Sequence, residues 1–427
     1  MMNATTLTFP QQMTRIDRSA RQWLMSKLKS LPIGHLTVIE RYDDQQASDQ
    51  PRSDSHQSVQ KNITRVGSSE DGQIKATIII NDGRFFARML KGGSIAAGEA
   101  YMDGWWESPD LTAVMELMAQ NMTMLDSMEK KAGLVTQLGY RLGHWLNRNT
   151  LGQSRKNIHA HYDLGNDLYG LFLDQNMLYS SALYLNTFDT LEDAQTNKMA
   201  RLCEQLDLKE SDEVLEIGTG WGAMAIYMAQ NYGCQVTTTT ISDEQYAYAH
   251  LEVQRLGLEQ KITLLKQDYR ILEGKYDKIV SIEMIEAVGK QFLASYIAKC
   301  QSLLVKGGRF AIQAITIADQ RYESYSQNVD FIQKYIFPGG FLPSVSKLAE
   351  AATTYSDFVI RDVFDIGLDY AKTLNEWHQR FNAQEHSVRK LGYDERFIRM
   401  WRYYLCYCEG GFKAKSISTV QITFERR

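Results

Sequence analysis

The 427-residue sequence has little of what marks several broad classes of protein. Five of its residues are cysteines, and no two of them form a CxxC pair. This pattern argues against a disulfide framework and favours a reduced, cytoplasmic chain. The eight histidines contain one close pair, His159 and His161, and show no zinc-ligand spacing. We therefore expect no metal site.

The sequence also lacks a charge excess and a long apolar run. Its formal net charge is −4, which gives no electrostatic reason to expect nucleic acid as a partner. No window approaches the roughly 18 apolar residues that a membrane-spanning helix needs. The first residues have no signal-peptide layout of basic and then apolar side chains. Any membrane contact is therefore expected to be peripheral, at the inner face.

The length favours two domains, and we place the first at residues 1–145. Arg15 to Leu31 has apolar residues at helical spacing and basic residues opposite, as in a helix lying on an anionic membrane or an ordinary surface helix. Residues 43–73 are polar and predict a flexible loop. Ile74–Ile80 and Arg84–Leu90 then predict two strands of a hairpin, so this domain is expected to be small and α+β.

A polar linker is predicted at residues 146–158, and the second domain at 159–427. From Leu206 onward, apolar strands alternate with helical segments, which indicates an α/β fold with a mostly parallel sheet and helices on both faces. The predicted strands are Val214–Ile217, Gln235–Ile241, Ile262–Lys266, Tyr276–Ile282, Arg309–Ile315, Phe358–Phe364 and Ser418–Phe424.

A glycine loop follows the first of these strands. Gly218, Gly220 and Gly222 have GxGxG spacing, unlike the GxGxxG of dinucleotide-binding proteins, and precede a helix. Such a loop lets a backbone approach a cofactor at the edge of the sheet. Glu216, two residues before the loop, suits a ligand with a cationic amino acid group and would repel a pyrophosphate.

The ends of the next two strands refine this prediction. The second strand ends in threonines up to Thr240, where an acidic residue would ordinarily bind ribose hydroxyls. Asp268 follows the third strand, where a carboxylate commonly meets an adenine amino group. The alternative for Asp268 is a turn or helix cap.

Several motifs in order along the chain resemble the cyclopropane-fatty-acyl-phospholipid synthases, relatives of the mycolic acid methyltransferases. The resemblance implies a Rossmann-like class I methyltransferase fold with a seven-stranded sheet, and S-adenosylmethionine as methyl donor. The matching segments are 101–106, 161–167, 177–181, the glycine loop, 240–245, 267–270, 283–289 and 335–340.

The resemblance also implies roles for individual residues. The family holds a bicarbonate ion with Cys, Glu, His and Tyr, and the matching residues here are Ser181, Glu286, Gln313 and Tyr370. Cysteine has thus become serine, and histidine has become glutamine. The cofactor site implied, together with Glu216 and Asp268 from the preceding arguments, comprises Tyr162, Tyr179, Ser180, Glu216, Gly218, Gly220, Thr240, Gln245, Asp268 and Tyr269.

This chemistry explains the residue types. A cis alkene attacks the sulfonium methyl and leaves a carbocation, which must be kept from water and which aromatic faces stabilise. A base then removes a proton from the transferred methyl to close a cyclopropane ring. Loss of a neighbouring proton would instead give a methyl- or methylene-branched chain. Candidate aromatic residues are Tyr335, Phe337, Phe341, Trp401, Tyr403 and Tyr404, each of which could equally belong to a core.

The sequence therefore predicts an enzyme that adds a methylene to unsaturated phospholipid acyl chains, with branching without ring closure as the alternative. A catalytically silent lipid-binding module would not need the cofactor residues. A small-molecule N- or O-methyltransferase would not explain the first domain, which is expected to dock on lipid or on a second copy in a homodimer.

Overall fold

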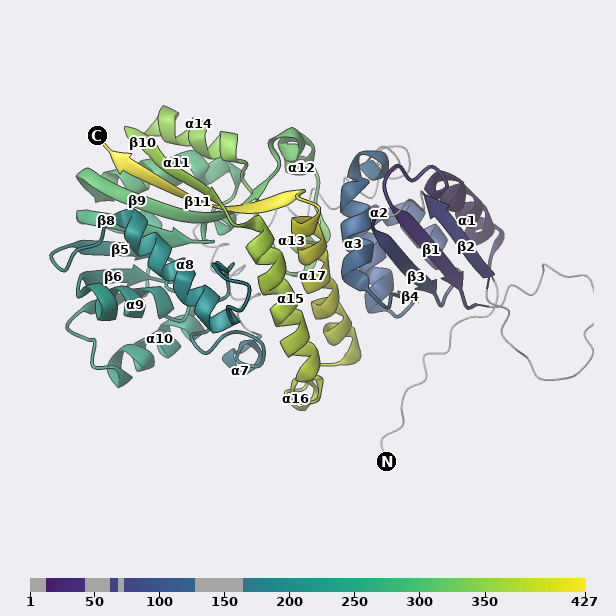
Figure 1. Cartoon of the computed structure of the whole chain (residues 1–427), viewed down its shortest axis with the longest axis horizontal. Coiled ribbons are helices and arrows are strands. Elements are labelled where there is room, and N and C mark those ends of the chain that lie inside the picture. The colour runs from purple at the N-terminus through teal and green to yellow at the C-terminus, as the bar shows by residue number, and fades with distance from the viewer. Residues whose placement is uncertain (1–12, 43–61, 68–72, 127–163) are drawn as a thin grey trace, which may run out of the picture. The chain divides into compact units, whose positions relative to one another are not determined.

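The computed structural model describes residues 13–42, 62–67, 73–126 and 164–427 (Figure 1). Contacts within the chain divide it into two compact units. The first comprises residues 1–140 and 393–414, and the second comprises residues 141–392 and 415–427. This division differs from the predicted domains chiefly because a helix from near the C-terminus belongs to the first unit. The predicted linker at 146–158 lies outside the described residues.

The described part of the first unit has a four-stranded sheet with strand order β2-β1-β3-β4. Strand β1 is antiparallel to β2 and parallel to β3, and β4 is antiparallel to β3. The elements are α1 (Arg15–Leu28), β1 (His35–Glu40), β2 (Asn62–Gly67), β3 (Lys75–Ile80), α2 (Phe85–Met102), β4 (Trp106–Glu107), α3 (Leu111–Gln120) and α17 (Glu395–Lys413).

The hairpin prediction was wrong in its second half. Arg84–Leu90 is not a strand, because α2 begins at Phe85 and continues to Met102. The carboxylate of Asp82 accepts a hydrogen bond from the Arg84 backbone N–H at 2.9 Å and pairs with its guanidinium, so the turn starts a helix. The polar stretch 43–73 likewise contains β2, which pairs with β1 along its whole length.

The packing of α1 distinguishes the two alternatives for its basic amphipathic sequence, a helix lying on a membrane or an ordinary surface helix. Ala20, Leu24 and Leu28 on its apolar face are buried, and α1 packs on α2. Thr14 and Asp17 form a capping box at its start. The apolar face is therefore used within the unit, as in an ordinary surface helix.

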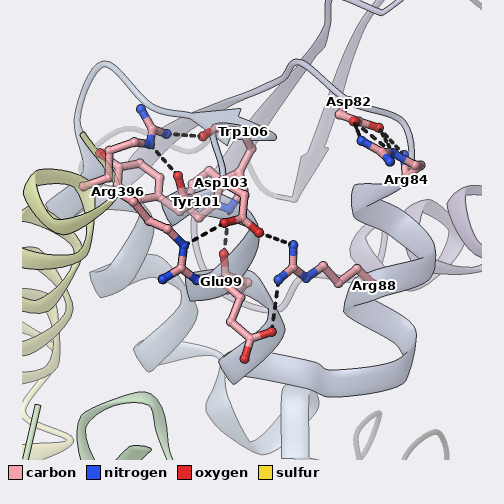
Figure 2. A network of polar contacts seen from close by, with 10 residues as sticks. Asp82, Arg84, Arg88, Glu99, Tyr101, Asp103, Trp106 and Arg396 are labelled. Carbon is pink, nitrogen blue, oxygen red and sulfur yellow. Dashed lines mark hydrogen bonds and ion pairs between the residues drawn. The ribbon is translucent and has the colours of Figure 1, made fainter. Parts of the chain in front are cut away.

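Helix α17 joins the first unit through its apolar face and through polar contacts. Gly410 lies so close to α3 that an added Cβ would be 2.5 Å from the Met115 Cβ. Figure 2 shows Arg396 reaching Asp103, with Nε 3.1 Å from the carboxylate oxygen. Trp401 and Tyr403 are buried on the same helix. The pairing of α17 with α2 and α3 explains why the C-terminal part of the sequence supplies a piece of the first unit.

In the described part of the second unit, seven strands form one sheet in the order β10-β11-β9-β8-β5-β6-β7. Strand β11 is antiparallel to both of its neighbours, and the pairs from β9 through β7 are parallel. The strands are β5 (Glu213–Ile217), β6 (Gln235–Thr239), β7 (Ile262–Leu265), β8 (Tyr276–Ile282), β9 (Leu304–Ile317), β10 (Phe358–Asp365) and β11 (Ile417–Arg426). All seven predicted strands are confirmed, as is the mostly parallel sheet.

Helices cover both faces of this sheet (Figure 1). Leu215 packs in one core with residues of α11 and α14, while its neighbour Val214 packs in the other with α8 and α9. The helices are α7 (Asn166–Tyr169), α8 (Leu191–Leu206), α9 (Ala223–Tyr232), α10 (Asp243–Arg255), α11 (Leu293–Leu303), α12 (Tyr322–Ser326), α13 (Phe331–Tyr335), α14 (Val345–Tyr355), α15 (Gly367–Ala383) and α16 (Glu385–Lys390). Across the described residues of both units, no helix combines the length and apolar character needed to cross a membrane.

Candidate active site

The glycine loop leaves the carboxyl end of β5, the central position of the parallel strands. Gly218, Gly220 and Gly222 all have positive φ, at 101°, 53° and 98°. A Cβ added at Gly220 would meet no atom within 4 Å, so this backbone borders open space. The N–H groups of Gly218 and Thr219 donate to the carbonyl of Thr239 on β6, which fixes the start of the loop. This geometry leaves room for a cofactor beside a rigid backbone.

Glu216 lies just before the loop and is buried, with 3% of its surface exposed. Its Oε2 accepts a hydrogen bond of 2.6 Å from the Thr238 hydroxyl, which also lies 2.7 Å from the Thr219 hydroxyl. Burial raises the pKa of Glu216 to about 8, and the hydrogen bond from Thr238 opposes this shift. Glu216 thus connects β5 to β6 directly behind the loop.

The residues predicted after β6 form a local network. The Thr240 hydroxyl donates to Gln245 Oε1 at 3.0 Å and accepts from the Ser242 N–H at 3.1 Å. The Ser242 side chain caps α10 by accepting from the Gln245 backbone. These contacts hold Thr240 and Gln245 at the carboxyl edge of the sheet, next to the glycine loop.

The two residues predicted after β7 lie at the same edge. The Asp268 carboxylate accepts from the Arg270 backbone and forms an ion pair with its guanidinium at 2.6 Å. Asp268 thus caps this turn, and its contact with the adenine amino group stays a prediction. Burial raises the pKa of Tyr269 well above its ordinary value, and its ring packs edge-on against Tyr296 at 5.3 Å.

The segment before α8 contributes Tyr179, Ser180 and Ser181. Tyr179 stacks obliquely against Trp377, with ring centroids 5.3 Å apart, and lies 6.3 Å from Phe337. The Ser180 hydroxyl accepts a 2.7 Å hydrogen bond from Nζ of Lys198, which is completely buried. Burial lowers the pKa of Lys198 to about 8, against the opposing charge of Glu283.

Glu283, directly after β8, collects three hydrogen bonds from separate parts of the chain. Its Oε1 accepts from the backbone N–H of Ser181 and from Nε2 of Gln313, each at 2.9 Å. Its Oε2 accepts from the hydroxyl of Tyr370 on α15 at 2.8 Å. Burial raises the pKa of Glu283, while these donors and the charge of Lys198 oppose the shift.

A relay of side chains orients the amide of Gln313. Arg201 on α8 donates to Gln421 Oε1 at 2.8 Å, so the Gln421 amide nitrogen faces Gln313 and donates to its Oε1 at 2.9 Å. The Gln313 nitrogen is thereby directed toward Glu283. Gln313 itself is completely buried in β9.

Glu286, three residues after Glu283, has different contacts. Its Oε1 accepts from the backbone N–H of Ile315 at 2.5 Å, and its buried Oε2 has no hydrogen-bond partner among the described residues. Burial, and then the charge of Glu283, raise the pKa of Glu286 to about 8. Side-chain donors from Gln313 and Tyr370 are directed at Glu283 and none at Glu286, so the arrangement favours the ionised form at Glu283 over Glu286.

Comparisons with known sequences and structures identify the family of this chain. A family model described as mycolic acid cyclopropane synthetase matches residues 149–422. Cyclopropane-fatty-acyl-phospholipid synthase of Escherichia coli (strain K12) is 39% identical over 373 residues, which cover 85% of this chain and 91% of that protein. The chain belongs to this family.

One further relative in sequence and one solved structure are similar to this chain. A tuberculostearic acid methyltransferase of Mycobacterium tuberculosis is 36% identical over 357 residues, covering 79% of this chain and 80% of that protein. The crystal structure of mycolic acid cyclopropane synthase CmaA1 with SAH and CTAB has a TM-score of 0.61 and 27% identity, over 64% of this chain and 98% of that one. The family member described here is thus an S-adenosylmethionine-dependent methyltransferase with the class I fold.

The structure brings together most, though not all, of the residues predicted for the family site. Ser181, Gln313 and Tyr370 meet at one point, but the carboxylate that they share is that of Glu283, while Glu286 contacts Ile315. Tyr162 lies outside the described residues. Sequence reasoning missed Glu283, Lys198 and Gln421. The one available signal was the second glutamate in the motif Glu283-Met284-Ile285-Glu286.

Proposed function

We propose that this enzyme transfers a methylene from S-adenosylmethionine to the cis double bond of an unsaturated phospholipid acyl chain and closes it to a cyclopropane. The observation that carries the proposal is the position of the carboxylate site beside the glycine loop. A Cβ added at Gly218 would lie 3.3 Å from the Cβ of Met284, the residue after Glu283. A methyl donor in the loop would therefore lie near a proton acceptor, as ring closure requires.

In the proposed reaction, the alkene π electrons attack the sulfonium methyl, and the carbon–sulfur bonding electrons remain on sulfur. The resulting cation needs a dry site with aromatic faces. Tyr179, Trp377 and Phe337 form such a cluster beside Ser180. Of the predicted aromatic residues, Tyr403 has another environment, because it packs against Tyr101 and Trp106 in the first unit.

The resemblance also implies a bicarbonate ion at this site. The Gln313 amide and the Tyr370 hydroxyl, which would hold it, are already hydrogen-bonded to Glu283, as is the Ser181 backbone N–H, and the Ser181 hydroxyl donates to the Ala182 carbonyl. A second anion there would lie against a carboxylate. The described residues do not fit a bound bicarbonate, and no step of the reaction is assigned to one.

The substrate class implies that the enzyme works at a membrane surface, as a peripheral protein. Exposed apolar residues support this proposal: Leu185 and Phe188 are 64% and 95% exposed in the loop before α8, and Leu368 is 56% exposed at the start of α15. The Tyr184 backbone N–H donates to Asp369 at 2.9 Å and holds the two segments together. We also propose, from the family resemblance, that the first unit helps to dock the enzyme on lipid or on a second copy.

The reaction is tested on the lipids of cells that produce the full chain. Mass spectrometry is expected to find unsaturated phospholipids heavier by one CH₂, and NMR to find cyclopropane ring protons. A branched alkene in place of the ring would assign the same methyl transfer without ring closure. Absence of any mass gain in phospholipids would contradict the proposed substrate.

A further inference from the structure

We propose that the Glu283 carboxylate is the built-in base for ring closure and takes the place that the family gives to a bicarbonate ion. The inference rests on the proposed function and adds to it the identity of the proton acceptor. It starts from the disagreement between the anion implied by the family and the donors present, which all converge on a side chain of the protein itself.

The donors around Glu283 form an anion-binding site that the Glu283 carboxylate itself occupies. Four separate segments contribute to it: the loop before α8, the end of β8, the middle of β9 and the first turns of α15. Ser181 and Gln313 are completely buried and Tyr370 is 6% exposed. Three donors at 2.8–2.9 Å hold both carboxylate oxygens in place. Glu283 itself, directly after β8, is half-buried.

The backbone of Glu283 supports a functional origin for this arrangement. Its φ is 49°, in the left-handed region that residues other than glycine seldom adopt. Such a conformation is strained and is retained where neighbouring structure imposes it. Here the Glu283 N–H donates to the Gln313 carbonyl at 2.8 Å, which fixes the backbone so that the side chain meets its three donors.

The nearby titratable groups favour an ionised Glu283. The Lys198 charge opposes the rise in the pKa of Glu283, while burial and the Glu283 charge raise the pKa of Glu286 to about 8. The raised pKa of Glu283 makes its carboxylate a stronger base than an exposed one. The same carboxylate attracts positive charge as it develops on the acyl chain.

The chemical step balances without an external reagent. After methyl transfer, the Glu283 carboxylate takes one proton from the transferred methyl group. The electrons of that carbon–hydrogen bond form the second bond to the acyl chain at the cationic carbon, which closes the ring. Glu283 becomes a neutral carboxylic acid, and its proton passes to water after the product leaves.

The test measures methyl transfer and ring formation separately. The purified full-length chain is mixed with S-adenosylmethionine and vesicles of dioleoylphosphatidylglycerol and dioleoylphosphatidylethanolamine. Buffers are either freed of carbon dioxide or supplemented with bicarbonate. Release of S-adenosylhomocysteine reports methyl transfer, and mass spectrometry with NMR reports ring and open products. The wild-type rate of ring formation is expected to be the same, within twofold, in both buffers.

Two substitutions then separate the base from its hydrogen bonds. Glu283→Gln keeps an acceptor for the donors but removes the base, and is expected to lower ring formation by ~10²–10⁴-fold. Release of S-adenosylhomocysteine should fall less, with open branched products appearing. Glu283→Gly suits the positive φ and frees the donors, so added bicarbonate should restore part of its ring formation. Glu259→Gln, an exposed glutamate of the same unit, is the matched control and should change neither rate.

Each contrary result has a distinct meaning. A wild-type enzyme that needs added bicarbonate for ring formation would overturn this inference and leave the proposed function intact. A Glu283→Gln enzyme that closes rings at the wild-type rate would also overturn it. The same holds if Glu283→Gln lowers the rate of ring formation less than Glu286→Gln does. Failure of the wild-type chain to add a methylene to either lipid in both buffers would overturn the proposed function itself. Binding of S-adenosylmethionine by each variant shows that it has folded.

Discussion

The glycine loop and the carboxylate site lie side by side at one edge of the sheet, yet they are built in opposite ways. The loop comes from one continuous stretch, Gly218 to Gly222, and depends on backbone conformations that glycine allows. The carboxylate site depends on the side chains of Glu283, Gln313 and Tyr370 and on the backbone N–H of Ser181, which only the complete fold brings together. The first kind of site can be recognised from local sequence, whereas the second must be found in three dimensions.

The largest expected effect comes from disturbing the loop alone. Gly220 and Gly257 form a matched pair, because both have positive φ and an added Cβ at either would meet nothing within 4 Å. Valine at either position imposes a similar strain, about 1–3 kcal/mol. Only Gly220 belongs to the loop, since Gly257 precedes β7 at the opposite edge of the sheet.

We expect Gly220→Val to weaken S-adenosylmethionine binding by ~10–100-fold, measured by calorimetry, because the loop must relax away from its binding conformation. Gly257→Val should lose as much thermal stability as Gly220→Val but bind the cofactor with the wild-type affinity. Equal losses of affinity in both variants would show that general destabilisation, and not the loop, controls binding.

The same contrast explains what the sequence could and could not predict. All seven strands of the large sheet were predicted, because apolar runs alternate with helical segments and the glycines mark the loop. Arg84–Leu90 was misassigned, since Phe85 and Phe86 favour a strand locally, while the Asp82 contact that starts α2 is not visible in a hydrophobic pattern. Likewise, the sequence cannot reveal that α17 packs on α2 and α3, more than 250 residues earlier in the chain.

The sequence analysis did not single out Glu283 as a site residue. The motif Glu283 to Glu286 contains two carboxylates, and the family resemblance directed attention to the second. The choice between them depends on where Tyr370 and the Ser181 backbone lie, which are 87 and 102 residues away in sequence. A resemblance carries over residues that match, whereas Glu283 is held in part by a residue that departs from the family pattern, Gln313.

A second prediction concerns the buried carboxyl behind the loop. The pKa of Glu216 is about 8 in the folded protein, against an ordinary value of 4.5 in an unfolded chain. Between these two pH values, the folded protein retains a proton that the unfolded chain has released. Rising pH therefore lowers the free energy of unfolding across this window, by up to about 1.4 kcal/mol per pH unit from Glu216.

Glu216→Gln should remove this contribution while keeping an acceptor for Thr238. Urea unfolding of the cofactor-free protein, followed from pH 5 to pH 8, is expected to give a shallower loss of stability in the variant than in the wild type. Glu286→Gln should also flatten the curve, because its pKa is likewise about 8, whereas the exposed Glu259→Gln should not. Identical slopes in Glu216→Gln and the wild type would contradict the assignment of a bound proton to Glu216.

The smallest effect is expected from the relay behind the carboxylate site. Gln421→Met removes the donor that fixes the Gln313 amide, without touching Glu283 or the glycine loop. One buried hydrogen bond has a net value of about 1 kcal/mol, so ring formation should slow by ~3–10-fold. The loss should appear in kcat and in a higher share of open product, with KM for S-adenosylmethionine unchanged because the loop is built independently. Thr423→Val, two residues along the same strand and equally buried, should leave the product ratio as it is. If Gln421→Met raised KM for the cofactor and left the product ratio unaltered, the two sites would be coupled, and the relay would serve the loop and not the base.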